Sequence, residues 1–463
     1  MTDRRLHAAD ALLPTGWARA VLFEWNDGGD LVAVTPDAPA PDGAATAAGP
    51  VVPGLTNLHS HAFQRAFAGL AEFRGSIDDS FWSWRERMYR LANAVTPDEL
   101  EAIATWLFVE MLEGGYTSVC EFHYLHHDLD GRPYADDAAL ATCLAQAAAI
   151  AGLGLTLLPV LYQQSGFGGV APTEGQRRFI RSTDALLRLV EALRRASAGP
   201  ATRVGVAVHS LRAVTPEAMQ QVLSGLDALD LTAPIHIHVA EQQREVEECL
   251  AWSGQRPVAW LLDHAAVNER WCLVHATHMS PDETRRAAAT GAVAGLCPTT
   301  EANLGDGIFD WPGWTSAMPA RWGVGSDSHV TVNAAEELRL LEYTQRLRTG
   351  RRNVAATAQE PHVGTAMTLA AVAGGAAAGG RPVSGLAVGQ RADFVVLDGA
   401  HPLIAGVPAP DALDAHVFAS HRASAIDAVV VGGQTVVRHG RHALHAPAGE
   451  AFVRARAALL ARL

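Results

Sequence analysis

The sequence contains no lysine, so all 36 of its basic residues are arginine. Mechanisms that need a lysine amine, such as Schiff-base catalysis and phosphate binding by a P-loop, are therefore excluded. A carbamylated lysine that bridges two metal ions is excluded for the same reason. Any metal chemistry in this chain has to use other ligands.

Cysteine is scarce, with five residues in 463, and none of them is spaced as CxxC. An odd number of scattered cysteines argues against a disulfide framework and against a zinc site built from thiolates. We expect each of them to be a small buried apolar residue. They are Cys120, Cys143, Cys249, Cys272 and Cys297.

Long apolar runs and an excess of positive charge are also missing. No apolar run is long enough to cross a bilayer, and the first 21 residues lack the unbroken apolar region of a secretory signal, so we expect a cytoplasmic protein. The formal net charge of −13 provides no general basic surface. Nucleic acids and anionic membranes are therefore not expected as partners.

Eight β-rich segments, most of them separated by Ala- and Leu-rich stretches of helical periodicity, predict a parallel sheet. Eight such repeats favour a (β/α)₈ barrel, with an open doubly wound sheet as the alternative. The barrel is preferred because it gathers the polar residues at the strand ends into one place. The segments are 51–61, 117–124, 155–164, 203–214, 233–242, 271–279, 291–305 and 321–329.

Both ends of the chain have a different composition, with short β-like runs interrupted by Gly and Asp. Such runs suit a small antiparallel sheet to which both termini contribute. We therefore predict a barrel at 53–375 and a small β-sandwich domain made of residues 1–52 and 376–463. The stretch AVAGGAAAGG (371–380) is interpreted as the end of a helix followed by a linker.

Histidines gather at the predicted strand ends. His59 and His61 are two residues apart on one strand, so their side chains point the same way. The fifth strand offers His236 or His238, of which His238 is favoured because Glu241 follows three residues later, and the eighth offers Asp327. Three nitrogens and one carboxylate oxygen suit a divalent cation that keeps a position open for water. Further polar residues at strand ends are Tyr124, Gln163, Gln164, His209, Arg212, His275, His278 and His329.

Several motifs resemble those of the amidohydrolase superfamily, in particular its mononuclear deaminases. They are PGLTNLHSHAFQRA, HIHVAEQ, LVHATH, GVGSDSH and the tail SGLAVGQRADFVVLD. The longer stretches SFWSWRERMYR, EFHYLHH, LLPVLYQQSGFGG, VHSLRAV and CPTTEANLGDGIFDW resemble the formimidoylglutamate deiminases of histidine degradation. The resemblance spans nearly the whole chain.

By position, the resemblance implies one zinc ion, with Fe²⁺ or Mn²⁺ as substitutes. The implied ligands are His59, His61, His238 and Asp327; the implied catalytic residues are Glu241, His275 and Asp327; the implied substrate contacts are Gln64, Arg85, Tyr124, His209 and Arg212. The implied substrate is N-formimidoyl-L-glutamate, a cationic amidine with two carboxylates, which arginines bind well. We also expect a homodimer.

Two other functions are compatible with parts of the sequence. A related mononuclear enzyme could deaminate a purine, a pyrimidine or a triazine, but such rings call for aromatic stacking and amide hydrogen bonds, and this chain offers arginines and a tyrosine. A non-catalytic scaffold of the same fold should have lost a metal ligand or Glu241, and all of them are present.

Overall fold

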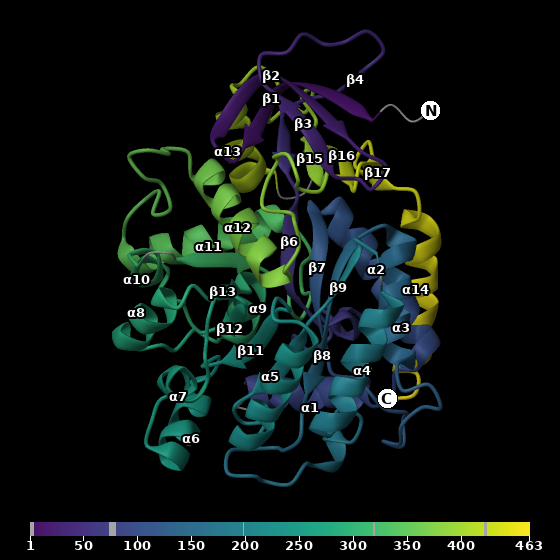
Figure 1. The fold of residues 1–463 in the computed structure, drawn as a ribbon, viewed down its shortest axis with the longest axis vertical. Coiled ribbons are helices and arrows are strands. Elements are labelled where there is room, and N and C mark those ends of the chain that lie inside the picture. Colours follow the sequence, from purple (N-terminus) through teal and green to yellow (C-terminus); the bar gives the residue numbers. More distant parts are fainter. Residues whose placement is uncertain (1–3, 74–79, 198, 318–319, 421–423) are drawn as a thin grey trace.

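A computed structural model describes residues 4–73, 80–197, 199–317, 320–420 and 424–463. They form two sheets of nine strands each, and the smaller domain sits at one end of the larger (Figure 1). The predicted barrel and its companion β domain are both confirmed. None of the described helices is long and apolar enough to cross a membrane.

Eight parallel strands form the barrel, and β9 (Thr202–Val204) adds a short strand beside β8. The barrel closes where the first and last strands meet, because Ser60 pairs with Asp327 and the Asp327 amide donates to the His59 carbonyl at 2.9 Å. The eight strands are β6 (Leu55–Ser60), β7 (Tyr116–His123), β8 (Gly154–Leu161), β10 (Val206–Ser210), β11 (Ile235–Val239), β12 (Trp271–His275), β13 (Val293–Leu296) and β14 (Arg321–Val324).

Helices surround the barrel, and several begin with the caps that their sequences predict. In α2 (Pro97–Glu113), Thr96 and Glu99 form a capping box and proline takes the first turn. The others near the barrel are α1 (Phe81–Ala92), α3 (Ala139–Ala151), α4 (Thr183–Ala196), α5 (Pro216–Leu229), α6 (Gln243–Ser253), α7 (Pro257–His264), α8 (Pro281–Ala289), α9 (Pro298–Leu304), α10 (Trp311–Thr315), α11 (Ala334–Thr349) and the short 3₁₀ helices η1 (Ala62–Phe67) and η2 (Glu174–Gln176).

The stretch 371–380 is the end of a helix, as expected, but it contains no linker, so that part of the expectation is wrong. It continues α12 (Val363–Gly379), a largely buried helix that packs on β6 and β14. Its glycines allow this close approach, because a Cβ atom at Gly374 would lie 1.8 Å from the Trp322 carbonyl oxygen and one at Gly375 would lie 2.8 Å from Cβ of Thr56.

The second sheet draws on both termini, as predicted. It curls around its own core, since Phe23 of β2 stacks on Phe394 of β15 with ring centroids 6.0 Å apart, although β1 and β5 separate these strands in the sheet. Most pairs are antiparallel, but β1 pairs in parallel with β4 and β5. The strands are β1 (Arg5–Leu13), β2 (Gly16–Trp25), β3 (Leu31–Thr35), β4 (Ala45–Thr46), β5 (Val51–Pro53), β15 (Phe394–Leu397), β16 (Ile426–Val431), β17 (Gln434–Arg438) and β18 (Arg441–His442).

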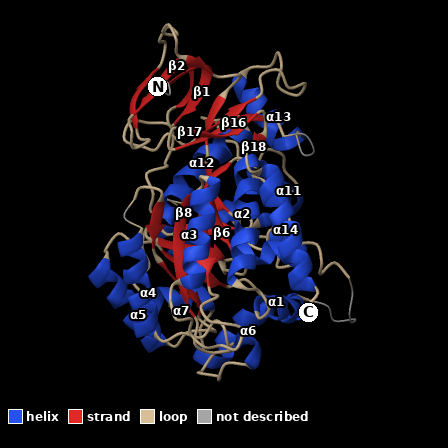
Figure 2. Ribbon diagram, turned by 90° about the vertical axis from the view of Figure 1, so that its right-hand side faces the viewer, coloured by secondary structure: helices blue, strands red, loops and turns tan. Residues whose placement is uncertain are grey.

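Two helices follow within the C-terminal segment, which the sequence analysis treated as β structure only. α13 (Ala409–Ala419) packs on α11 and α12, and α14 (His445–Leu460) packs along α2 on the flank of the barrel. Helix α1 lies at the end of the barrel opposite the small sheet, as two perpendicular views show (Figures 1 and 2). The carboxyl ends of the barrel strands lie on the same side as α1.

The closing seam supports one stability prediction. The Asn57 side chain donates to Ser326 Oγ at 2.6 Å and accepts from the Ser326 amide at 3.0 Å, inside the protein. Asn57→Ala leaves the buried Ser326 amide without an acceptor, so the free energy of unfolding of the metal-free protein should fall by about 2–4 kcal/mol. Urea denaturation measures this change. The exposed Asn303→Ala should change it by less than about 0.5 kcal/mol, and equal effects would contradict the assignment.

Candidate active site

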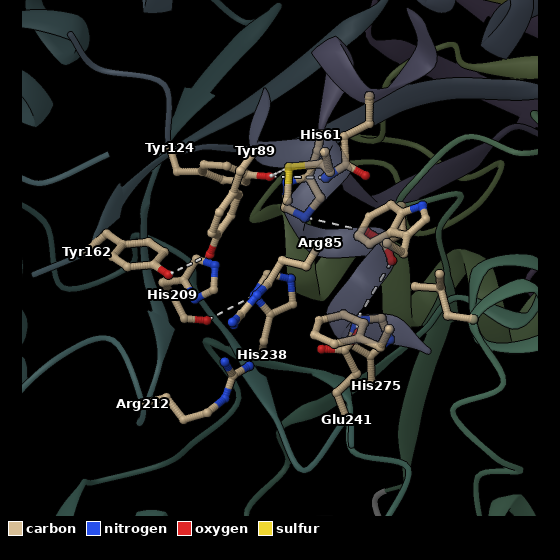
Figure 3. Close-up of a pocket in the computed structure, with 16 residues that line it drawn as sticks. His61, Arg85, Tyr89, Tyr124, Tyr162, His209, Arg212, His238, Glu241 and His275 are labelled. Carbon is tan, nitrogen blue, oxygen red and sulfur yellow. Dashed lines mark hydrogen bonds and ion pairs between the residues drawn. The ribbon is translucent and has the colours of Figure 1, made fainter. Parts of the chain in front are cut away.

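A cavity of about 540 Å³ opens at the carboxyl ends of the barrel strands (Figure 3). Polar residues at the ends of barrel strands, together with others from η1 and α1, line it. This position agrees with the general location of active sites in barrels of this type. The lining residues are His61, Gln64, Phe81, Trp84, Arg85, Met88, Tyr89, Tyr124, Tyr162, His209, Arg212, His238, Glu241, His275, Leu304 and Asp327.

Three buried imidazoles and one carboxylate converge at the floor of this cavity. The Nε2 atom of His59 lies 3.1 Å from that of His61 and 2.9 Å from that of His238. Oδ1 of Asp327 lies 3.4 Å and 3.3 Å from the Nε2 atoms of His59 and His61. His59 therefore lies next to all three of the other expected ligands.

The hydrogen bonds behind two of the imidazoles fix their tautomers. His61 Nδ1 donates to the Phe122 carbonyl at 3.0 Å, and His238 Nδ1 donates to the His209 carbonyl at 2.9 Å, because a carbonyl can only accept. In the neutral rings both Nε2 atoms then carry a lone pair, and both lie next to His59 Nε2. Ligands about 2.0–2.1 Å from a zinc ion adopt similar separations, so these lone pairs are placed to bind a cation.

Electrostatics keep these rings neutral and therefore able to bind a metal. Burial and the neighbouring histidines hold the pKa values of His59 and His238 well below the ordinary value. Burial also lowers the pKa of His61, although Asp327 opposes the shift. The Phe122 ring lies beneath all three, with centroid distances of 4.4–5.3 Å, and holds them in place. The donor set fits one divalent cation.

Two further acid–base groups flank the metal-binding cluster. His275 Nε2 lies 3.7 Å from Glu241 Oε1 and 3.8 Å from Asp327 Oδ2. On its other side, His275 Nδ1 donates to Glu301 Oε1 at 3.3 Å, and the Cys297 amide donates to the same oxygen at 2.9 Å. Glu301 therefore fixes the orientation of the His275 ring.

Backbone strain coincides with this arrangement. His275 and Asp327 have φ angles of +64° and +47°, and Ala240, Ala276 and His329 are also left-handed. Such angles are costly for residues with a Cβ atom and tend to cluster at functional sites. At Asp327 the strained backbone is held by the hydrogen bonds that close the barrel.

The proton affinities of the flanking groups are shifted strongly. Burial, opposed by His275 and reinforced by Asp327, raises the pKa of Glu241 to about 7. Burial lowers the pKa of His275, but Glu241, Glu301 and Asp327 outweigh it and raise the pKa to about 10. Glu241 can therefore take up and release a proton near neutrality, while His275 keeps a proton on Nε2 that it can share in a hydrogen bond.

The opposite wall of the cavity carries two arginines. Arg85 of α1 stacks over Trp82 at 4.5 Å and has no carboxylate partner among the described residues. Arg212, which follows β10, is buried, and its Nε atom lies 3.8 Å from Glu245 Oε2. Burial opposes the charge of Arg212, but Glu245 and Glu241 raise its pKa, so it stays cationic. This wall is suited to an anion.

The three remaining predicted substrate contacts also lie in the cavity. Gln64 of η1 donates to the Tyr124 hydroxyl at 3.0 Å, and the other atom of its amide, Oε1, is buried with no partner in the described part of the chain. His209 packs against Tyr162 in a tilted arrangement, with ring centroids 4.3 Å apart. Burial, Arg212 and His61 hold the pKa of His209 well below the ordinary value, so its ring is neutral.

The other histidines near the strand ends point away from the cavity. His236 Nε2 donates to the Ala378 carbonyl at 2.8 Å on the far side of β11, so His238 is the histidine that reaches the metal-binding cluster. His278 donates to the Asp306 carbonyl and His126 to the Val160 carbonyl. His329 binds Ser60 and Ser326 at the closing seam.

Some functional positions were not foreseen from the sequence. Glu301 and Asp306 follow β13, where the sequence predicted no polar site residue, and Asp306 lies beside Glu241 and His275. Tyr89 and Tyr162 line the cavity next to the arginines. Tyr162 directly precedes the glutamines named at the third strand end, so strand-end position was a usable signal for it, whereas Tyr89 enters from a helix.

Comparison with known proteins identifies the family. Residues 51–436 match the amidohydrolase family, and residues 3–46 match the N-terminal domain of formimidoylglutamate deiminase HutF. A formimidoylglutamate deiminase of Pseudomonas aeruginosa is 52% identical over 98% of this chain and 99% of its own length.

Solved structures agree with this assignment. A crystal structure of an amidohydrolase from Brucella melitensis is 50% identical, covers 99% of this chain and 100% of its own, and superposes with a TM-score of 0.93. An adenosine deaminase from Xanthomonas campestris with bound zinc has a TM-score of 0.79 at 21% identity over 98% of both chains, which shows the fold alone. The chain therefore belongs to the amidohydrolase family and, within it, to the formimidoylglutamate deiminases.

Proposed function

We propose that this protein hydrolyses N-formimidoyl-L-glutamate to N-formyl-L-glutamate and ammonia. The observation that carries the proposal is the lining of the cavity, which combines a metal-binding cluster and two acid–base groups with two arginines. A cationic amidine joined to a dicarboxylate tail matches both sets of residues. The relative that is 52% identical carries the same activity in its name.

The proposed cofactor is one zinc ion held by His59, His61, His238 and Asp327, with Fe²⁺ or Mn²⁺ as possible substitutes. When bound, a divalent ion supplies the Lewis acidity that makes water nucleophilic at neutral pH. The support is the donor set, which consists of neutral imidazole nitrogens and one carboxylate without a thiolate.

The protein residues would then divide the proton transfers. Asp327 accepts a proton from the attacking water, whose oxygen forms a bond to the formimidoyl carbon. His275 donates a hydrogen bond to that oxygen as charge develops on it, while Glu241 delivers a proton to the departing nitrogen, so that the C–N bond breaks and ammonia leaves. Glu301 keeps the His275 ring in the orientation that this hydrogen bond requires.

Arg85 and Arg212 would bind the carboxylates of the substrate. Their guanidinium groups are held in advance by Trp82 and by Glu245, so little side-chain freedom is lost on binding. Tyr124, Gln64 and His209 line the same cavity and would contact the rest of the substrate.

Three further features remain predictions from the sequence. They are the cytoplasmic location, the homodimeric state and the domain boundaries at 52/53 and 375/376. Light scattering of the purified protein tests the second directly.

The metal site is tested by elemental analysis. Purified protein should contain about one divalent ion per chain, and a chelator should abolish activity until metal is added back. His238→Asn should lose the ion because it removes one of four ligands. The matched control is His236→Asn, on the same strand but facing away, which should keep the ion. A reproducible content of two ions per chain would contradict the single site.

The proton-transfer role of Glu241 is tested by Glu241→Gln, which preserves shape and removes the titrating group. We expect kcat to fall at least 100-fold, the order of a general acid–base contribution, with metal content unchanged. Because Glu241 must hold a proton to donate it and its pKa is raised to about 7, the kcat of the unmodified enzyme should fall as pH rises through about 7. The residual kcat of the variant should lack this step.

The exposed Glu247→Gln on α6 is the control for that experiment and should leave both kcat and its pH profile unchanged. Loss of metal together with activity in Glu241→Gln would instead make Glu241 a ligand.

Substrate specificity is tested by Arg85→Met and Arg212→Met. Each removes a cation that faces a carboxylate, at a cost of roughly 2–5 kcal/mol in kcat/KM for formimidoylglutamate. Formamidine has no tail, so its hydrolysis should change much less. Arg90→Met, exposed on the same helix as Arg85, should behave like the unmodified enzyme. A wild-type enzyme that ignores formimidoylglutamate but deaminates guanine or adenosine derivatives would overturn the proposed function.

A further inference from the structure

Two tyrosine hydroxyls meet beside the arginine wall. Tyr89 Oη, from α1, lies 3.2 Å from Tyr162 Oη, which follows β8, and both residues line the cavity (Figure 3). Neither was assigned a role above. Burial raises the pKa of Tyr162 well above the ordinary value, so its hydroxyl keeps its proton.

A third residue, Gln176 of η2, fixes the direction of this hydrogen-bonded chain. The Thr173 amide donates to Gln176 Oε1 at 2.8 Å, and because a backbone amide can only donate, this atom must be the side-chain oxygen. The other end of the amide is therefore the NH₂ group, which donates to Tyr162 Oη at 2.7 Å. The Tyr162 oxygen thus serves as an acceptor toward Gln176, and its proton has to point elsewhere.

One of the two tyrosine hydroxyl protons is left without a hydrogen-bond acceptor. The two hydroxyls have two protons, and one of these is used between Tyr89 and Tyr162. The other has no acceptor among the described residues, whichever tyrosine carries it. A donor that lines a cavity and lacks a partner is available to a ligand.

The surroundings determine which ligand atom this donor suits. The Arg85 guanidinium lies 5.5 Å from the centre of the Tyr89 ring, and the neutral His209 ring packs on Tyr162. Arg85 and Arg212 both act electrostatically on Tyr162. A free hydroxyl proton in this cationic region favours an anionic oxygen as its acceptor.

We propose that the Tyr89–Tyr162 hydroxyl pair, oriented by Gln176, donates the hydrogen bond that selects a carboxylate on the substrate. The inference rests on the proposed function and adds specificity-determining residues to it. The arginines would supply charge, while the pair would supply a directed donor that distinguishes a carboxylate from an uncharged group.

The first test removes the hydroxyls. In Tyr89→Phe/Tyr162→Phe, kcat/KM for formimidoylglutamate should fall about 10- to 100-fold, mostly through KM, because a hydrogen bond to a charged group is lost. Formamidine, which has no carboxylate, should be hydrolysed at the unmodified rate. The control is Tyr343→Phe, on the exposed side of α11, which should change neither substrate.

The second test keeps both hydroxyls and reverses the direction of the hydrogen bonds between Gln176, Tyr162 and Tyr89. Gln176→Glu replaces the donor with an acceptor, so Tyr162 donates to the new carboxylate, Tyr89 donates to Tyr162, and no proton remains for the cavity. The loss for formimidoylglutamate should match that of the double phenylalanine variant. In the double phenylalanine background, Gln176→Glu should lower kcat/KM little further. An equal further loss there would mean that the new charge acts directly on the substrate, and it would overturn the proposal.

These outcomes separate the inference from the proposed function. If the unmodified enzyme hydrolyses formimidoylglutamate and the double phenylalanine variant matches it, the inference fails while the proposed function stands. If formimidoylglutamate is not a substrate of the unmodified enzyme, both fail. Equal losses for formimidoylglutamate and formamidine would make the tyrosines structural and also overturn the inference.

Discussion

The site depends on two hydrogen bonds that lie behind it. The Phe122 and His209 carbonyls each take the Nδ1 proton of a histidine, which leaves a lone pair on Nε2 of His61 and of His238. These two atoms lie 3.1 Å and 2.9 Å from His59 Nε2, so both are ready to bind a cation there. The strands that carry these carbonyls, β7 and β10, supply no ligand themselves, yet they determine which atoms of their neighbours can bind metal.

Strand periodicity explains why most of the site was predictable from the sequence. Alternation along a strand places His59 and His61 on one side, and the rule that sites lie at the carboxyl ends of barrel strands brings His238, His275 and Asp327 to them. Periodicity alone left His236 and His238 as alternatives. The deciding fact is a bond to the Ala378 carbonyl on α12, which no local pattern reveals.

The parts that were missed depend on contacts between distant segments. Tyr89 reaches the cavity only because α1 folds across the strand ends, and Glu301 acts through a ring 26 residues earlier in the chain. Glycines at 374 and 375 suggested a linker, because helix propensity counts them as breakers. They are required where α12 touches Trp322 of β14 and Thr56 of β6, a close approach that appears only after the barrel is assembled.

The closing seam of the barrel also bears on how the protein reaches its active form. Ser60 and His329, which bind each other there, are 269 residues apart in sequence. Loop closure over such a separation is costly and slow, so contacts of this kind form late in folding. Because His59, His61 and Asp327 flank the seam, the coordination shell cannot exist in an intermediate whose first and last strands are still apart. The ability to bind metal at full affinity therefore arises only when the barrel closes.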